Sequence, residues 1–529
     1  MADTTNGVTG RVFARASSGL VRQVGTLDTL YYSLLQAAPQ FIFLMLAAWV
    51  LYPGSSMELA TVVAVVGSAL VGVVYGLYAS VYPRSGGEYV FISRTVHPAI
   101  GFLVSFLFTF WMAWSVGTNA AIVSIFALAP TFVALGFQLG NPMLTDIGAN
   151  LGQPWGIFLV GLVTEMFFWY VLVRGMKTYF TLQRWFFIAA YASIAVTVLV
   201  LIGGVTGILH FQTNFDALVG SGAYNKVISD GQAAGAVLNS RFDLGSTLNF
   251  VVWPAESVLF AFTAVAFAGE VRNARRGPLI GIVGGVIAAG AILFVLAFLS
   301  RLAFGESFLK AASFIGKDFP APNAYFPLLA SILGGNGVLT LLINIWFVIL
   351  SFFLSGACAI YASRAIFAWS IDGMAPEVLG RVSDRYHSPT WAIAVSVIGG
   401  FITLVLFSFT TLLTILSALI SQSFVFLVVC LAGIVFPYKY RSMYKASAAR
   451  MELFGVPVMT LAGIGGAIYM SWILFRAITD NTAAVNTPFT FYLTAASFVI
   501  AIAWFYIARW WRKRQGVDVD LRFREIPIE

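Results

Sequence analysis

The chain has 529 residues, of which 60% are hydrophobic, 16% aromatic and only 10% charged, and its formal net charge is +8. Soluble proteins usually carry about 25% charged residues, so this composition excludes an ordinary soluble globular protein. Apolar stretches long enough to cross about 30 Å of hydrocarbon as helix recur along the sequence. They predict an all-α polytopic membrane protein.

We count about twelve such stretches by their length and hydropathy. They run approximately over residues 28–52, 59–82, 98–126, 155–173, 184–209, 246–271, 277–302, 337–367, 389–408, 411–436, 456–477 and 489–511. An even number of spans places both termini on the same side of the membrane. The first 27 residues contain no apolar signal-peptide core, so we expect them to stay in the cytoplasm.

The basic residues support this orientation. With these spans, one face carries six of the 30 Lys and Arg residues and the terminal face carries the other 24. The six are Lys226, Arg241, Arg301, Lys310, Lys317 and Arg476. The positive-inside rule therefore predicts cytoplasmic termini and a multi-pass protein of the plasma membrane. Because the charges are dispersed over short loops beside the bilayer, we expect contact with lipid and no nucleic-acid partner.

The spans divide the chain into six parts. We expect an N-terminal cytoplasmic segment (1–27), a first set of five helices (28–209), an exposed extracellular loop (210–245), a second set of five helices (246–436) with a short outer helix near 320–335, two further helices (437–511) and a cytoplasmic tail (512–529). Cys358 and Cys430 lie within spans, and the three histidines lie far apart. These positions predict neither a metal site nor a cofactor.

The first span contains LLQAAPQF (34–41) and the sixth contains VVWPAESVLF (251–260), so proline interrupts both. Proline removes a backbone hydrogen bond, and lipid cannot satisfy the groups that it frees. Interruptions at matching positions of two halves indicate inverted repeats with a substrate site near the membrane midplane. Two ordinary proline kinks are the alternative. The predicted substrate-binding residues are Gln36, Ala37, Ala38, Pro39, Gln40, Trp253, Pro254, Ala255, Glu256, Ser257 and Phe260, with Trp111 and Asn344 added from their depth in the third and eighth spans.

Within the sixth span, we expect Pro254 to end an outer half-helix and Ser257 to cap an inner one. Glu256 would then lie in the gap, either protonated or facing a cation, because a lone charge at membrane depth is unfavourable. A neutral Glu256 that bonds to the broken backbone is the alternative. Glu165 in the fourth span is the second candidate for proton coupling, unless its neutral carboxyl bonds to a neighbouring helix.

Three segments at the predicted cytoplasmic face carry more specific patterns: YPRSGGEYVFISRTVHPAIGF (82–102), AGEVRNARRGP (268–278) and ASRAIFAWSIDGMAPEVLGRVSDRYHSPTWA (362–392). Their order and positions resemble those of the amino acid–polyamine–organocation permease superfamily, over about residues 22–510. The resemblance implies a leucine-transporter-type fold, in which a five-plus-five inverted repeat with broken helices 1 and 6 is followed by two C-terminal helices.

The resemblance further implies a secondary transporter, not an enzyme, that moves an amino acid or related amine by alternating access. Transport of this small-molecule substrate would be driven by protons. The position of the eighth span that binds sodium in relatives offers only the hydroxyls of Ser351 and Ser355. The first-span stretch QAAPQF lacks the glycines that bind the substrate carboxylate in many relatives, and the sixth span carries the acidic Glu256, which would suit an amine. A polyamine or organic-cation exchanger is therefore the alternative. An ion channel or a membrane enzyme finds no support, since neither a continuous polar pore nor a catalytic cluster is apparent.

Glu88, Glu270 and Arg364 belong to these three segments. Acidic side chains gain nothing from lipid phosphate, so we expect the three residues to form a cytoplasmic salt-bridge gate. Simple anchoring to headgroups is the alternative, and it is the favoured one for Arg275 and Arg276.

Overall fold

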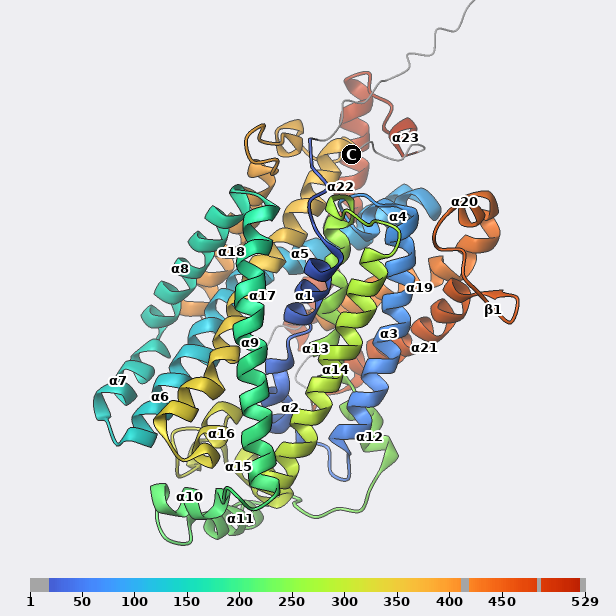
Figure 1. Ribbon diagram of the computed structural model, residues 1–529. Helices are drawn as coiled ribbons and strands as arrows, with labels where there is room; N and C mark the ends of the chain where they lie inside the picture. The colour runs from blue at the N-terminus through green and yellow to red at the C-terminus, as the bar shows by residue number, and fades with distance from the viewer. Residues whose placement is uncertain (1–18, 411–417, 483–486, 524–529) are drawn as a thin grey trace, which may run out of the picture.

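The computed structural model describes residues 19–410, 418–482 and 487–523. This part of the chain forms a bundle of helices (Figure 1), with 12 helices long and apolar enough to span a membrane. The predicted all-α polytopic fold is thereby confirmed. Three parts of the predicted elements lie outside the described residues: the first 18 residues, the start of the tenth span at 411–417 and the end of the tail at 524–529.

The twelve spans are composed of the following elements. They are α1 (Thr26–Gln36), η1 (Pro39–Phe41) and α2 (Ile42–Trp49); α3 (Met57–Val81); α5 (Pro98–Ile122), η2 (Val123–Leu128) and α6 (Ala129–Leu139); α8 (Pro154–Val173); α9 (Met176–Val205); α12 (Leu244–Phe250), α13 (Val252–Leu259) and η3 (Phe260–Glu270); α14 (Gly277–Phe304); α17 (Gly337–Ile371); α18 (Thr390–Phe409); α19 (Leu419–Lys439); α21 (Val458–Thr479); and α22 (Pro488–Arg514).

Shorter elements connect the spans. They are α4 (Glu88–Thr95), α7 (Pro142–Leu151), α10 (Phe211–Val219), α11 (Ala223–Ala233), α15 (Glu306–Ile315), η4 (Gly316–Asp318), α16 (Phe326–Gly334), η5 (Glu377–Gly380), α20 (Arg441–Ala446), the antiparallel strands β1 (Glu452–Leu453) and β2 (Val456–Pro457), and α23 (Val519–Arg522). Figure 1 shows both ends of the described chain at one end of the bundle, here called the terminal face. The opposite end, with α10, α11, α15 and α16, is called the far face.

The spans pack as two related sets of five. The second packs on the seventh (α3 and α14), the third on the eighth (α5 and α17), and the fourth on the ninth (α8 and α18). The first span packs on the seventh (α1 and α14), and correspondingly the sixth packs on the second (α13 and α3). The fifth span packs on the eighth (α9 and α17), and correspondingly the tenth packs on the third (α19 and α5). Exchanging each span with the one five places later therefore preserves the packing. Spans five apart cross in opposite directions, which is the arrangement of an inverted repeat.

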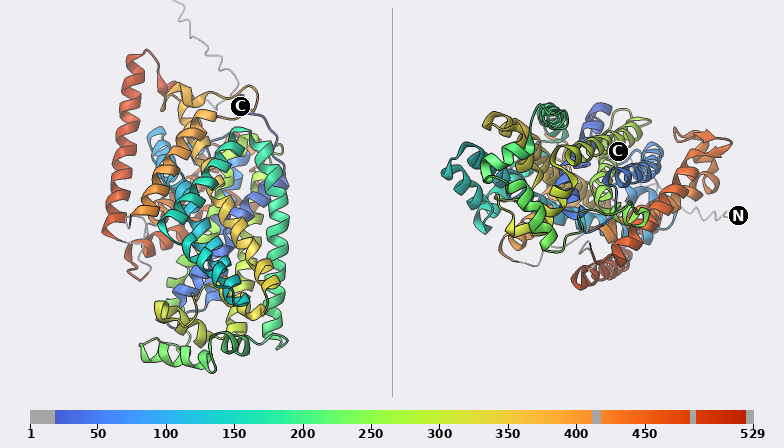
Figure 2. Two further views of the ribbon diagram at one scale, coloured as in Figure 1. Left: turned by 90° about the vertical axis from the view of Figure 1, so that its left-hand side faces the viewer. Right: turned by 90° about the horizontal axis from the view of Figure 1, so that it is seen from below.

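Local capping explains where several spans begin. Ser56 accepts the N–H of Leu59 at 3.2 Å before α3, and Asn336 accepts that of Leu339 at 2.9 Å before α17. These side chains satisfy amides that have no partner within the helix. The last two spans lie at one edge of the bundle (Figure 2), and α22 buries only 22% of its apolar window. Most of α22 is thus available to lipid.

Two predicted boundaries are corrected. The third span was expected to end near residue 126, but it continues to Leu139 through a π-helical turn, η2. This turn directly precedes Pro130, which has no N–H to donate. Its wider coil lets the helix continue although that hydrogen bond is missing. The segment 210–245, expected as an exposed loop, contains α10 and α11. Their buried residues Phe211 and Phe215 pack against Phe308 of α15 at ring distances of 5.2 Å.

Candidate functional site

The first span is broken directly after α1, as the sequence predicts. α1 ends at Gln36, Ala38 takes a left-handed conformation with φ 47°, and η1 begins at Pro39. A left-handed conformation costs an alanine about 1–2 kcal/mol, so neighbouring groups must hold the chain in this turn. Ala37 and Ala38 are completely buried. The break therefore lies inside the protein and not against lipid.

The hydroxyl of Ser257 in α13 supports the break. It lies 2.5 Å from the carbonyl oxygen of Ala37 and 3.1 Å from that of Ala38. These carbonyls follow the end of α1, where helical C=O groups lack intrahelical partners. Ser257 thus caps the broken first span from the sixth span. The prediction that it caps a half-helix of its own span is wrong.

The sixth span is distorted, but further along the chain than predicted. Val251 joins α12 to α13 with helical angles, φ −53° and ψ −27°, so the backbone over 253–257 is not unwound. Pro254 is the third residue of α13, within a first turn where its missing N–H is tolerated. Glu256 therefore lies within a helix and not in a gap. The distortion begins at Phe260, the first residue of η3.

The 3-10 helix η3 covers Phe260–Glu270, and Phe267 within it leaves helical geometry with φ −111° and ψ 24°. Runs of 3-10 helix beyond three or four residues are uncommon and often mark hinges. Its carbonyls accept hydrogen bonds from other segments, including the N–H groups of Gln23 and Val24 at Glu270. Ala261 accepts the Ser33 hydroxyl at 3.3 Å, and Ala266 accepts the N–H of Gly86 at 3.0 Å. η3 is therefore the attachment point for both the first span and the loop after the second.

Several buried polar atoms, on residues close in sequence to the break or to its cap, have no hydrogen-bond partner among the described residues. Both amide atoms of Gln36 and Gln40 are in this state, as is one carboxylate oxygen of Glu256. Leaving such a group unpaired costs about 1–3 kcal/mol, so native proteins rarely tolerate it without water or a ligand. Gln36 follows Tyr32 by one helical turn, and the Tyr32 hydroxyl bonds to the carbonyl of Ala357 in the eighth span at 3.2 Å. The Gln36 amide thus faces the interior of the bundle.

Gln422 is a further buried amide, and sequence reasoning missed it. It is 0% exposed, and neither of its polar atoms has a partner within the described chain. One turn along α19, the ring of Phe426 contacts Phe262, Tyr75 and Phe108 at 5.1, 5.6 and 5.3 Å between centroids. Gln422 therefore lies one turn from the junction of the second, third, sixth and tenth spans. An amide inside an apolar span was the available signal.

Two other predicted site residues, Asn344 and Trp111, make contacts with neighbouring protein side chains and backbone. Asn344 donates to Ser331 of α16 at 3.0 Å and to the carbonyl of Thr340 at 2.7 Å, so it attaches α16 to α17. Trp111 is 2% exposed and packs against Trp114 of its own helix at 6.0 Å. Substrate contact by Asn344, Trp111, Trp253, Pro254, Ala255 and Phe260 stays a prediction.

Glu165 lies between the fourth and ninth spans. A Cβ added at Gly400 of α18 would meet the Glu165 Oε1 at 2.9 Å, so the absence of a side chain at Gly400 makes room for this carboxyl. Both Glu165 oxygens are buried and without a partner among the described residues. α8 packs against α18, α5 and α17. Glu165 therefore lies on a helix that forms neither half of the break and does not carry its cap.

A buried ion pair lies at the terminal face. The Nε of Arg364 lies 3.0 Å from Oε1 of Glu270, and both side chains are 0% exposed. Glu88 does not complete this pair. Its carboxylate accepts the hydroxyl of Tyr361, one turn before Arg364 on α17. Burial raises the pKa of Glu88 to about 7, although the Tyr361 bond lowers it. The predicted three-residue network is therefore two separate contacts on α17.

The segment before α1 also contacts Glu270. The backbone N–H groups of Gln23 and Val24 both donate to the carbonyl of Glu270 at 3.0 Å, and Arg272 donates its N–H to Val24 at 2.9 Å. At the start of α1, the carboxylate of Asp28 lies 2.5 Å from Nε of Arg184 in the fifth span. The end of η3 and the start of α1 are consequently held together at the terminal face.

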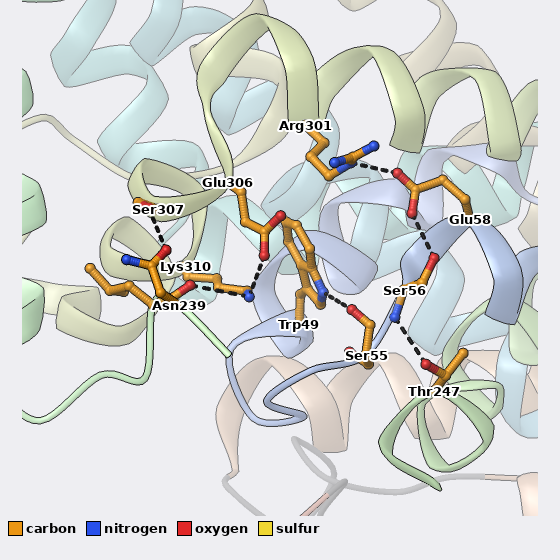
Figure 3. Close-up of polar contacts among 11 residues, drawn as sticks. Trp49, Ser55, Ser56, Glu58, Asn239, Thr247, Arg301, Glu306, Ser307 and Lys310 are labelled. Atoms are coloured by element: carbon orange, nitrogen blue, oxygen red, sulfur yellow. Dashed lines mark hydrogen bonds and ion pairs between the residues drawn. The ribbon is translucent and has the colours of Figure 1, made fainter. Parts of the chain in front are cut away.

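A second set of polar contacts lies at the far face (Figure 3). The ammonium of Lys310 in α15 is 1% exposed, lies 2.6 Å from Glu306 and sits 4.6 Å from the ring centroid of Trp49 at the end of α2. Beside it, Arg301 pairs with Glu58 at 2.6 Å. These contacts attach α15 and the end of α14 to the far-face ends of the first and second spans.

Comparison with known proteins agrees with this architecture. The family model described as amino acid permease matches residues 37–505, a range that begins at the break and ends in the last span. A search of curated proteins finds no match. Since the family match covers most of the sequence, the chain belongs to the amino acid permease family.

Proposed function

We propose that the protein is a secondary active carrier that moves an amino acid or a related amine by alternating access. Its family is one of membrane transporters of amino acids or related substrates, rather than of enzymes. The observation that carries the proposed mechanism is the break in the first span. It is buried, capped by Ser257 and flanked by the unpaired amides of Gln36 and Gln40.

Charge at the break supports recognition of a zwitterion or an amine. The end of α1 carries partial negative charge and the start of η1 carries partial positive charge, which favour an ammonium and a carboxylate respectively. Ser257 already occupies the carbonyls of Ala37 and Ala38. We therefore assign ammonium recognition to the carboxylate of the adjacent Glu256. Because 253–257 is helical, the sixth span would contact substrate through side chains and not through free backbone groups.

Proton coupling is assigned to Glu256 in preference to Glu165. Glu256 is next to the residue that caps the break, whereas Glu165 is packed beside Gly400 in the interface of α8 and α18. A proton on Glu256 would therefore alter the charge that the substrate meets. A proton on Glu165 would act only through movement of helices.

Alternating access needs a closure on each side of the site. The Arg364–Glu270 pair and the Glu88–Tyr361 contact supply one at the terminal face, and the Lys310 cluster supplies one at the far face. We propose that the terminal face is cytoplasmic, because the far face holds six of the 30 Lys and Arg residues.

A polyamine or organic-cation exchanger of the same fold is the second candidate. The observation that favours it is Glu256, a carboxylate next in sequence to Ser257, which caps the break, with an oxygen that has no partner in the described chain. Such a site would attract a cation that lacks a carboxylate. The choice of labelled substrate separates the two candidates.

Counterflow in proteoliposomes tests the proposal. Vesicles loaded with unlabelled amino acid or polyamine should accumulate the labelled compound transiently, as only a carrier does. The effective compounds are found first by a thermal-shift screen of amino acids and polyamines. If every compound equilibrates without exchange, the carrier mechanism is refuted.

Two variants then test the assigned carboxylate. Glu256→Gln should abolish the dependence of uptake on a pH gradient and change the selectivity for amines, while Glu165→Gln should retain both. Unchanged selectivity and pH dependence in Glu256→Gln would return this residue to a structural role. Loss of pH dependence in Glu165→Gln alone would transfer the coupling to the interface of α8 and α18.

A further inference from the structure

A groove on the side of the bundle lies between α19 and the junction of α4 with α5. Its volume is about 530 Å³, and one wall follows α19 from Phe424 to Lys439. The other wall is formed by the end of α4 and the start of α5, including Thr95 and Ile100. The lining is almost entirely apolar. Val435, which lines it, is 52% exposed, so the groove is open toward the hydrocarbon.

The length of the groove matches one leaflet of a bilayer. From residue 424 to residue 439, α19 rises about 22 Å at about 1.5 Å per residue. Half of a bilayer, headgroups included, is about 20–22 Å thick. The apolar residues lie toward the middle of the membrane, and Lys439 lies at the terminal face. The groove thus has the polarity profile of a single phospholipid.

The polar end of the groove carries a positive charge without a carboxylate partner. The ammonium of Lys439 donates to the carbonyl of Thr95 at 3.2 Å and lies 5.3 Å from the ring centroid of Tyr440. No ion pair joins Lys439 to a carboxylate in the described part of the chain. An ammonium has three N–H donors, so donors remain for phosphate oxygens.

We propose that this groove binds one anionic phospholipid of the terminal-face leaflet. Its acyl chains lie along α19 and its phosphate contacts the ammonium of Lys439. Basic pockets between spans at the cytoplasmic side favour acidic headgroups.

A second groove provides an internal comparison. It lies along α22 beneath residues 373–377, has a volume of about 820 Å³ and ends at Arg512. There the guanidinium is already occupied. It lies 2.8 Å from the carboxylate of Glu377 and donates to the carbonyl of Gly373 at 3.1 Å. This larger groove therefore has no free charge with which to select an anionic headgroup.

Native mass spectrometry of the full-length protein tests the selection. Palmitoyl-oleoyl phosphatidylglycerol should remain bound more strongly than the matched phosphatidylcholine. Lys439→Gln should lower phosphatidylglycerol binding by about fivefold and phosphatidylcholine binding by less, because the choline group neutralises the phosphate of phosphatidylcholine. The control is Lys513→Gln, an exposed residue near the end of α22 that lines neither groove. Equal binding of the two lipids, or equal losses in both variants, would overturn the proposal.

A steric variant tests the location independently. Val435→Trp fills the groove and should remove the retained phosphatidylglycerol, while Ile502→Trp should not, because Ile502 is 48% exposed on α22 outside both grooves. Thermal stability of both variants checks that they fold. The same spectra report oligomeric state. If Val435→Trp instead converts a dimer to a monomer with lipid retention unchanged, the groove is an interface between copies and the lipid proposal fails.

Discussion

Replacing Ser257 by alanine tests the link between the broken first span and the sixth span most directly. The change removes one hydroxyl that serves two carbonyls. Ala38 keeps a second bond, because its carbonyl also accepts the N–H of Phe41 at 2.9 Å. Ala37 is left with a buried carbonyl that has no other partner among the described residues. Only this one group is newly unsatisfied.

The expected cost is therefore that of one orphaned buried carbonyl, about 1–3 kcal/mol. Relaxation of the left-handed turn at Ala38, which costs about 1–2 kcal/mol, would offset part of this loss and would change the shape of the break. Ser257→Ala should lower the melting temperature in detergent by several degrees. If substrate binds only to the capped break, its apparent affinity should fall by about tenfold or more.

The matched control is Ser396→Ala. Ser396 is equally buried, but its hydroxyl bonds at 2.8 Å to Ile393 of its own helix, so its loss leaves the contacts between spans intact. Ser257→Thr keeps a hydroxyl at the same place and should restore most of the stability and of the counterflow. Scanning fluorimetry and counterflow measure the two effects. Identical melting temperatures and exchange rates for Ser257→Ala and Ser396→Ala would refute the idea that the sixth span supports the break.

Three further predictions concern the two faces. Glu270→Gln leaves the buried Arg364 without a counter-charge and should cost about 3–5 kcal/mol, and adding Arg364→Met should recover most of the lost thermal stability. The pKa of Glu88, raised by burial from 4.5 to about 7, favours the protonated carboxyl in the folded state. Protonated Glu88 therefore adds at most about 3 kcal/mol to the free energy of unfolding. This contribution is complete below pH 4.5 and is lost as the pH rises through 7. The melting temperature should accordingly fall over this range in the parent and not in Glu88→Gln. Lys310→Met should speed amide hydrogen exchange in α15 by about thirtyfold, since a desolvated cation–π contact contributes about 2 kcal/mol and each factor of ten corresponds to about 1.4 kcal/mol. The exposed ion pair of Lys226 supplies the control, because Lys226→Met should leave exchange unchanged.

The sequence predicted features that depend on local chemistry. Twelve spans follow from the length of apolar runs, and the break in the first span follows from Pro39, which cannot extend the preceding helix. The sixth span was found, but the break within it was placed incorrectly, because the effect of Pro254 depends on where its helix begins. α13 begins at Val252, so Pro254 falls in a first turn and interrupts little. No local pattern distinguishes that case from a proline in mid-helix.

Partners distant in sequence were the other limit. Ser257 bonds to residues about 220 positions earlier in the chain, and Gln422 is brought to the central junction only by the packing of Phe426. The predicted gate of Glu88, Glu270 and Arg364 shows the same limit. All three do lie at the terminal face, yet Tyr361 and not Arg364 takes the Glu88 carboxylate. Sequence order identifies the face on which residues lie, whereas side-chain pairing depends on which helix faces which.

Helix α4 connects the proposed gate to the proposed lipid groove. Its first residue, Glu88, contacts Tyr361 of α17, and its last, Thr95, accepts the ammonium of Lys439 on α19. Between them Arg94 pairs with Asp372 at 2.7 Å, directly after α17 ends. If α17 moves when the terminal face opens, an eight-residue helix held at both ends must shift or release one of these contacts. A phosphate held by Lys439 beside Thr95 would then bind the open and closed states differently. By linkage, the same lipid would shift the balance between those states by an equal free energy.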